Sequence, residues 1–284
     1  MTESVAKVPV DGVAMTAIGV AVIRARESER PDRLYDDPQA AAFVAAARTG
    51  FEPGRWARVE AVADQFYEGR TVGVHLVDER FRAAITAGCA QIVLLGAGLD
   101  TRAYRMPLPP GTHVFEIDLL ELFAFKEPVL AALPATPACH RHVVVSDLRD
   151  DWRTPLLAAG FTPSVPTYWV DEGSLGYLNQ DWNQHVVRTL TDLSAPGSRF
   201  GAARYVVDPD APQYRDLRRL VAGDRASDPA PITTSQDFDV QSWLDSLGWS
   251  TEFRSWNDMT AHLDRPVGPL DPRIGNIAAV RRGR

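Results

Sequence analysis

The pattern of hydrophobic and polar positions divides the chain into two parts. Up to residue 87 the apolar positions recur at helical spacing, which predicts helices over 14–29, 38–48 and 71–87. From residue 91 onward, short β-branched or aromatic runs replace this period and predict strands. These runs cover 91–95, 113–118, 142–147, 167–171, 199–207, 250–254 and 277–281.

Helix-compatible segments lie between the predicted strands, among them 119–132, 182–193 and 236–247. Such alternation is typical of a parallel sheet with helices on both faces, so the fold class is predicted as α/β with about seven strands. Residues 208–235 carry Pro, Asp and Arg without a clean period. They are interpreted as an insertion over one sheet edge, either a substrate lid or a surface excursion without a chemical role.

Charge and cysteine content narrow the possible partners and compartment. The net charge of -7 repels both a phosphate backbone and an anionic bilayer, so neither nucleic acid nor a membrane is expected as a partner. The two cysteines, Cys89 and Cys139, show no CxxC spacing and no disulfide framework. With no signal-peptide pattern and no long uncharged run, the predicted location is the cytoplasm.

A glycine loop containing Gly96 and Gly98 follows the first predicted strand. In open α/β sheets, ligands bind beyond the carboxyl ends of the strands, where glycines let backbone N–H groups come close. The second strand closes on Asp118, whose carboxylate could accept both ribose hydroxyls of an adenosine ligand. Glu116 lies on the same face and is the alternative, but Asp118 is nearer the carboxyl end.

Asp147 closes the third predicted strand and could accept from the adenine amine, while Leu148 offers a backbone N–H; a helix N-cap is the alternative for Asp147. Thr101 replaces the third glycine of a dinucleotide-binding GxGxxG loop. The carboxylate of Asp100 suits a sulfonium better than a pyrophosphate. The residues therefore favour S-adenosylmethionine, with an NAD(P)-dependent oxidoreductase as the alternative.

The string over 91–106, which includes GAGLDTRAYR, resembles the signature of the leucine carboxyl methyltransferase-like family, which includes bacterial polyketide carboxyl O-methyltransferases. Similar blocks occur in family order around Asp37-Pro38, Arg70-Thr71 and Asp147-Leu148 and over 169–178. The resemblance implies a seven-stranded Rossmann-like methyltransferase sheet with an N-terminal helical extension. A single domain over 1–284 is predicted, comprising a helical cap (1–87), a nucleotide-binding core (88–207), the insertion (208–235) and C-terminal strands (236–284).

The resemblance also implies a set of residues that bind the methyl donor. These are Arg24, Arg70, Gly96, Gly98, Asp118, Asp147, Leu148 and Glu172. Arg70 would pair with the cofactor carboxylate through its fork of donors; without the resemblance it would be read as a surface helix residue. Gly176 stands where the family usually has a bulkier residue and could widen the acceptor side.

Methyl transfer from a sulfonium is an in-line displacement that mainly requires a well-placed acceptor. Tyr177 and Arg204 are the predicted residues for positioning an acceptor carboxylate, with core or surface roles as the alternative. His75 and His185 are the nearest bases, but a packed or solvated role is favoured for both.

His140 and His142 are not accompanied by a carboxylate or thiol cluster, so no metal is predicted.

The predicted function is S-adenosylmethionine-dependent O-methylation of a small molecule. A carboxylate of a polyketide or other secondary metabolite is favoured over a phenol. A protein carboxyl group, oxidoreductase activity and a non-catalytic cofactor-binding role are the alternatives, and the sequence predicts no oligomeric state.

Overall fold

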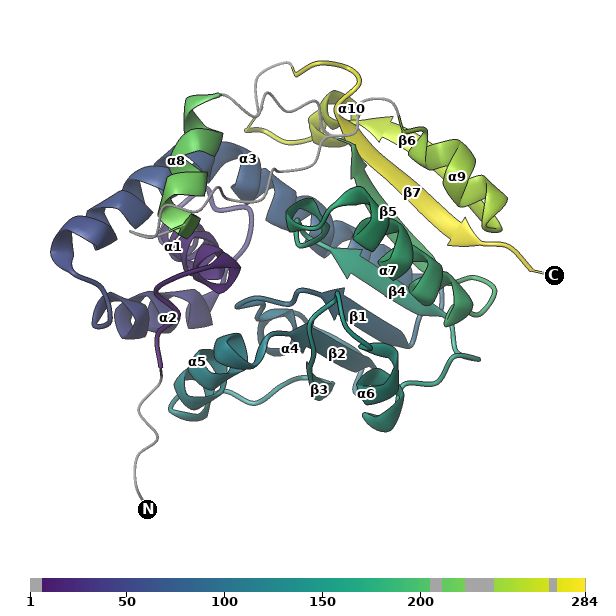
Figure 1. Cartoon of the computed structure of the whole chain (residues 1–284), viewed down its shortest axis with the longest axis horizontal. Coiled ribbons are helices and arrows are strands. Elements are labelled where there is room, and N and C mark those ends of the chain that lie inside the picture. Colours follow the sequence, from purple (N-terminus) through teal and green to yellow (C-terminus); the bar gives the residue numbers. More distant parts are fainter. Residues whose placement is uncertain (1–6, 205–210, 223–237, 266–269, 284) are drawn as a thin grey trace.

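The computed structural model describes residues 7–204, 211–222, 238–265 and 270–283. Within these ranges the chain forms a seven-stranded sheet with the order β3-β2-β1-β4-β5-β7-β6 (Figure 1). The strands are β1 (Gln91–Leu95), β2 (His113–Asp118), β3 (His140–Val145), β4 (Thr167–Asp171), β5 (Arg199–Arg204), β6 (Trp249–Ser255) and β7 (Gly275–Arg281). The predicted α/β class and the seven strands are confirmed.

Strands β1 to β5 run parallel to one another, and β7 runs antiparallel to its two neighbours, β5 and β6. The residue pattern does not reveal this reversal, because side chains alternate between the two faces whichever way a strand runs. The strand order and the single reversed strand are those of the methyltransferase sheet that the family resemblance implies.

The bounds of β1, β2 and β4 are as predicted. β3 was predicted over 142–147, but both of its ends lie two residues earlier. β3 begins at His140, whose backbone N–H donates to the carbonyl of Thr112 at 2.9 Å and which pairs with His113. It is an edge strand with several exposed positions, so its hydrophobic pattern is weak. For β5, residues 205–207 of the predicted strand lie outside the described residues.

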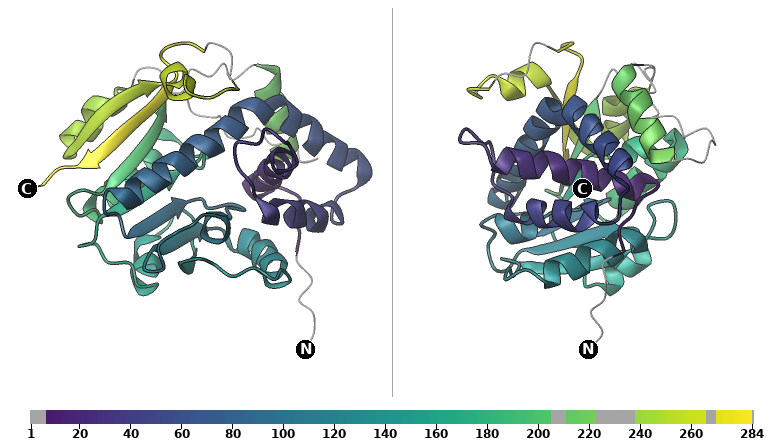
Figure 2. Two further views of the ribbon diagram at one scale, coloured as in Figure 1. Left: turned by 180° about the vertical axis from the view of Figure 1, so that it is seen from behind. Right: turned by 90° about the vertical axis from the view of Figure 1, so that its left-hand side faces the viewer.

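Helices cover both faces of the sheet. They are α1 (Thr16–Ser28), α2 (Pro38–Arg48), α3 (Pro53–Thr86), α4 (Arg102–Arg105), α5 (Leu120–Ala131), α6 (Arg153–Ala158), α7 (Gln180–Asp192), α8 (Pro212–Ala222), α9 (Val240–Ser246) and α10 (Trp256–Thr260). Val93 and Leu95 of β1 pack in one core with residues of α6, α7 and α9, whereas Ile92 and Leu94 pack with α3. Figure 2 shows α3 running across the face opposite α7.

Helix α3 is the main departure from the predicted elements. It was expected over 71–87 but begins at Pro53, a residue favoured at the first helical position. Its first half contains Gly69, which lowers helix propensity, but Trp56, Val59 and Val62 recur there at helical spacing and are buried, so the prediction missed a readable pattern. Trp56 packs with α1 and α2, and Phe81 packs beneath the sheet. One helix therefore ties the N-terminal helices to the sheet.

The described part of the predicted insertion is α8. Leu217 and Leu220 join the core of the N-terminal helices, and the ring of Tyr214 lies 5.5 Å from that of Phe66 on α3. The rest of the insertion, 208–210 and 223–235, lies outside the described residues. A role of this insertion as a lid stays a prediction.

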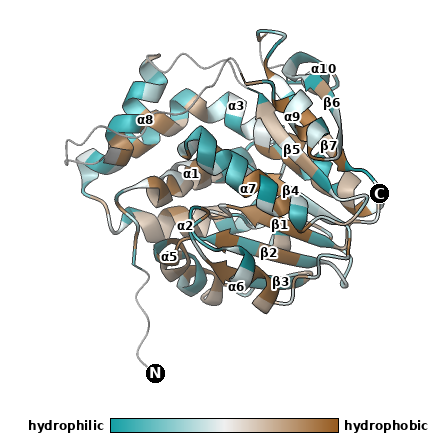
Figure 3. Cartoon of the chain, turned by 45° about the vertical axis from the view of Figure 1, so that its right-hand side comes forward, coloured by the Kyte–Doolittle hydropathy of each residue, from teal (hydrophilic) through white to brown (hydrophobic). Residues whose placement is uncertain are grey.

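Helices α7 and α8 are mainly polar in sequence. Figure 3 shows hydrophilic colours on the exposed turns of α7 and α8 and hydrophobic colours along the central strands. Among the helices of the described ranges, none combines the length and the apolar character that crossing a bilayer requires.

Candidate active site

The glycine loop forms a sharp turn at the carboxyl end of β1. Gly96 and Gly98 have φ angles of 67° and 52°, in the left-handed region that favours glycine. A Cβ on Gly96 would overlap the side chain of Ser174, and one on Gly98 would lie 3.4 Å from the Cβ of Ala17 on α1. The loop is therefore held between the segment after β4 and the first helix.

Asp118, at the carboxyl end of β2, is hydrogen-bonded to this loop. Its Oδ2 accepts from the N–H of Gly98 at 2.6 Å, and its Oδ1 accepts from the N–H of Leu119 at 2.7 Å. Burial raises the pKa of Asp118, and these two N–H groups work against the shift. Because a carboxylate offers about four lone-pair sites, Asp118 retains acceptor capacity for hydroxyls.

Glu116, the alternative to Asp118, is committed elsewhere. Its Oε2 lies 2.7 Å from Nζ of Lys126 and 2.7 Å from Nη2 of Arg141, and the carboxylate is fully buried. These ion pairs fix Glu116 against α5 and β3, and Asp118 is the carboxylate that accepts a hydrogen bond from the loop. The assignment of the ribose to Asp118 stays a prediction.

Asp147 follows β3, and the backbone places it near the end of β2, since Ser146 N–H donates to the carbonyl of Asp118 at 3.0 Å. Its carboxylate accepts from the backbone N–H and the guanidinium of Arg149, which lower the pKa of Asp147. Asp147 does not cap a helix, because α6 begins only at Arg153. The side chain of Leu148 is buried in the sheet core.

Arg70 and Glu172 meet at the carboxyl end of β4, although they are far apart in sequence. Nη1 of Arg70 donates to the carbonyl of Glu172 at 3.1 Å, and a Cβ on Gly173 would lie 3.6 Å from Nη2 of Arg70. The carboxylate of Glu172 lies 2.8 Å from Nη1 of Arg102. Both residues therefore stand at the edge where the resemblance places the cofactor.

Arg24 reaches the glycine loop from α1. Its Nη2 donates to the carbonyl of Leu99 at 2.6 Å, and its Nη1 lies 3.2 Å from Oδ2 of Asp37. Asp37 in turn accepts from the hydroxyl of Thr101 at 2.8 Å and caps α2 through Ala40 N–H. In this structure Arg24 holds the loop, and its predicted contact with the cofactor stays a prediction.

A buried ion-pair network behind the loop was missed by the sequence analysis. Arg102, only 2% exposed, pairs with the carboxylates of Asp78, Asp100 and Glu172, and Arg105 also pairs with Asp78. The proposed suitability of Asp100 for a sulfonium ligand is therefore wrong, because its carboxylate is turned into the protein and neutralised by Arg102. The available signal was the presence of charged residues, Asp100, Arg102 and Arg105, among the apolar residues of the loop and α4.

The network predicts an acid-sensitive stability. Burial alone would raise the pKa of Asp78, but the guanidiniums of Arg102 and Arg105 outweigh it and lower that pKa from 3.8 to about 2. Asp78 thus stabilises the fold above its ordinary pKa, and this contribution, roughly 2 kcal/mol, is lost as the pH falls toward about 2. Urea unfolding across this pH range should show the loss, and Asp78→Asn should flatten it. An equally steep profile in the variant would contradict the assignment.

The two predicted acceptor-positioning residues lie at the same edge of the sheet. Tyr177 belongs to the short 3-10 helix Leu175–Tyr177 after β4 and is half-buried. Arg204 is exposed at the carboxyl end of β5, with its guanidinium 5.3 Å from the ring centre of Phe253. Their roles toward an acceptor stay predictions.

Comparisons with known proteins agree with this arrangement. A relative from Parafrankia sp. (strain EAN1pec) is 38% identical over 95% of this chain and 87% of its own length. One from Saccharopolyspora erythraea is 36% identical over 94% of this chain and 93% of its own length. Both bear the name "putative S-adenosyl-L-methionine-dependent methyltransferase".

The model of the family "Leucine carboxyl methyltransferase" matches residues 17–191, a stretch that runs from α1 through β4 and most of α7. It includes the glycine loop, Asp118 and the ends of β3 and β4. The oxidoreductase alternative is thereby overturned. The chain belongs to the leucine carboxyl methyltransferase family and is an S-adenosyl-L-methionine-dependent methyltransferase.

Proposed function

We propose that this methyltransferase is an O-methyltransferase that methylates a carboxylate of a small molecule, such as a polyketide or another secondary metabolite. The description of its family as carboxyl methyltransferases supports a carboxylate acceptor. The net charge of -7 supports a partner other than nucleic acid. A phenol and a protein carboxyl group are the competing acceptors.

The residues at the carboxyl edge suit the methyl donor. Asp118 has acceptor capacity left for ribose hydroxyls, and Gly96 and Gly98 present backbone without a Cβ at the turn. Arg70 offers a guanidinium for the carboxylate of the donor's methionine part. When bound, S-adenosyl-L-methionine supplies an electrophilic methyl group, and the acceptor oxygen displaces its sulfur.

The observation that carries the proposal is the placement of the histidines. The sequence has six, all within the described residues. Three lie on the amino-terminal halves of β2 and β3, away from the carboxyl edge: His113, His140 and His142. His75 and His262 pair with Glu79, and His185 is exposed on α7. A carboxylate, with a pKa near ~4, is ionised at neutral pH and needs no such base, whereas a phenol near ~10 does.

Tyr177 and Arg204 are the proposed contacts for the acceptor carboxylate. A phenolic hydroxyl and a guanidinium can both donate to carboxylate oxygens. Tyr177 follows β4 and Arg204 is the last residue of β5. Both strands end at the edge where β1 and β2 end, because β1, β2, β4 and β5 are parallel. Their contribution would be orientation of the oxygen relative to the methyl group.

The product should be a methyl ester. We expect transfer of radiolabelled methyl groups from the donor to members of a panel of small carboxylic acids, and release of the label as methanol when the product is treated with dilute alkali. Methyl ethers of phenols survive this treatment. The matched control is a panel of phenols with the same carbon skeletons.

The pH dependence of the rate provides a second readout. With a carboxylate acceptor the rate should be flat from about pH 6 to 9, while a phenol acceptor should give a rise toward high pH. Alkali-stable label in the product would contradict the proposal. Donor binding without transfer to any carboxylic acid, phenol or protein would favour the non-catalytic role.

A further inference from the structure

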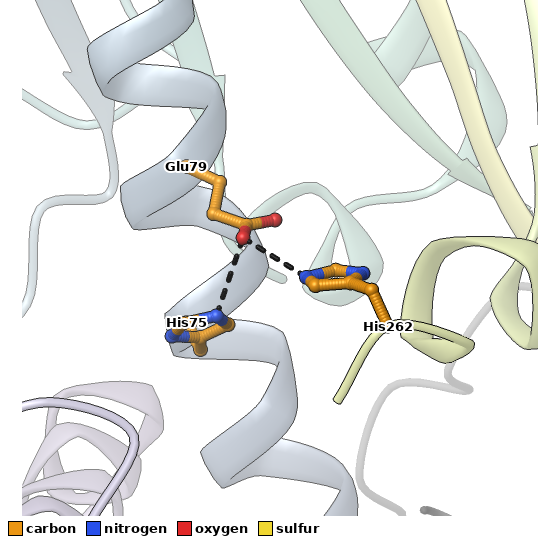
Figure 4. Close-up of side chains that lie close together, drawn as sticks. All are labelled: His75, Glu79 and His262. Carbon is orange, nitrogen blue, oxygen red and sulfur yellow. Dashed lines mark hydrogen bonds and ion pairs between the residues drawn. The ribbon is translucent and has the colours of Figure 1, made fainter. Parts of the chain in front are cut away.

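A second cluster of chemically active side chains lies on α3. His75 and Glu79 are one helical turn apart, and His262, from the turn after α10, points toward them (Figure 4). Nε2 of His75 lies 3.3 Å from Oε1 of Glu79, and Nε2 of His262 lies 3.1 Å from the same oxygen. Two imidazoles and a carboxylate thus converge on one point, although His262 is far from the other two in sequence.

We propose that His75, Glu79 and His262 form a binding site for a divalent transition-metal ion of the Zn²⁺ type. Imidazole nitrogen and carboxylate oxygen are ordinary ligands of such ions. Two donors that each lie about 2.0–2.1 Å from a tetrahedral Zn²⁺ are themselves about 3.3 Å apart. The two nitrogen–oxygen separations found here match that spacing, and all three ligand atoms lie within 4.8 Å of one another.

A backbone carbonyl holds the imidazole ring of His75 in one orientation, as is common for histidines that bind metals. Its Nδ1 lies 3.1 Å from the carbonyl oxygen of Leu34, and only a protonated nitrogen can donate to a carbonyl. In the neutral ring this leaves the lone pair on Nε2, which faces the carboxylate oxygen of Glu79. A carbonyl that holds the second nitrogen of a ligating histidine is a common outer-shell arrangement in metal sites. A lone pair that faces a carboxylate oxygen is stabilised by a cation between the two atoms, either a proton or a metal ion.

The site is open on one side. The side chain of His75 is 17% exposed, whereas those of Glu79 and His262 are 39% and 55% exposed. A metal ion could therefore enter from solvent, and water could complete the fourth position. Asp78, adjacent in sequence, is not a candidate ligand because it is buried in its pairs with Arg102 and Arg105.

Metal binding would fasten two distant parts of the chain. His75 and Glu79 belong to the helix that joins the N-terminal cap to the sheet, and His262 lies between β6 and β7. A ligand that binds only the folded chain stabilises it in proportion to its occupancy. This proposal is independent of the methyl acceptor, because it concerns binding and stability alone.

The test uses the untagged full-length chain, stripped of metal, in competition with a chromophoric Zn²⁺ chelator. We expect one Zn²⁺ per chain at this site and an affinity reduced more than about tenfold by His262→Gln or Glu79→Gln. The unfolding temperature should rise with Zn²⁺ in the wild type but not in these two variants. Co²⁺ should give the intense visible absorption of a tetrahedral complex. His185→Gln, an exposed helical histidine beside Trp182, is the matched control and should bind as the wild type does.

Binding of S-adenosylhomocysteine checks that each variant is folded. Equal Zn²⁺ affinity in the wild type, His262→Gln and Glu79→Gln would overturn the proposal, because any bound metal would then lie elsewhere. Absence of saturable binding to the wild type would overturn it as well. In that case the contacts would be those of a proton-bridged His–Glu–His cluster only.

Discussion

Replacing Asp118 by alanine is expected to weaken binding of S-adenosylhomocysteine by more than about tenfold. A hydrogen bond to a charged acceptor contributes about 1.5–3 kcal/mol, which is tenfold or more in affinity. Asp118 also accepts from Gly98 N–H, so the variant would loosen the glycine loop in addition. Isothermal titration calorimetry of the purified variant measures the change.

The matched control is Asp151→Ala. Asp151 also accepts from a backbone N–H, that of Thr154, but it is exposed at the start of α6. Its replacement should leave the affinity unchanged. Asp118→Asn separates the loss of the charged acceptor from the loosening of the glycine loop, because an amide oxygen can still accept from Gly98 N–H without the charge. Wild-type affinity in Asp118→Ala would show that another residue binds the ribose.

Replacing Arg102 by methionine is expected to cost about 3–5 kcal/mol of unfolding free energy. Methionine keeps much of the side-chain volume but leaves the carboxylates of Asp78, Asp100 and Glu172 without their shared cation. Removing one partner of a buried ion pair strands an uncompensated charge, which is the source of the large cost. Urea unfolding at neutral pH measures the loss.

Arg149→Met serves as the control for this second prediction. Arg149 forms an equally short pair with Asp147, but its side chain is 58% exposed. Exposed pairs contribute about 0–1 kcal/mol, so this variant should unfold nearly as the wild type does. An equal loss of unfolding free energy in both variants would contradict the view that burial makes the Arg102 network more stabilising than an exposed ion pair.

Most of the secondary structure could be predicted from the sequence because the buried positions of a helix or strand carry apolar residues at a regular spacing. β1 and β4 are buried over nearly their whole length, and their apolar runs give their bounds correctly. The prediction of β3 failed because this strand lies at the sheet edge with several exposed positions and presents no clear apolar period. The first half of α3 does carry buried apolar residues at helical spacing, among them Trp56 and Val59, and the prediction missed them.

The candidate cofactor site was predictable for a related reason. Its central parts, the glycine loop and Asp118, each directly follow a strand, and parallel strands bring their carboxyl ends together. The family resemblance added Arg70 and Glu172, which the fold places in contact. Asp100 was misinterpreted because sequence distance from the loop does not tell whether a carboxylate turns toward the ligand or toward Arg102.

The sequence by itself determined the α/β class, the glycine loop and the carboxylate at the end of β2, since these depend on local periodicity and on short spacings. Only the tertiary structure decided which charged groups share a buried network and that His262 meets His75 and Glu79. Those contacts join residues separated by long stretches of chain. Their geometry depends on how whole elements pack, and no local pattern encodes it.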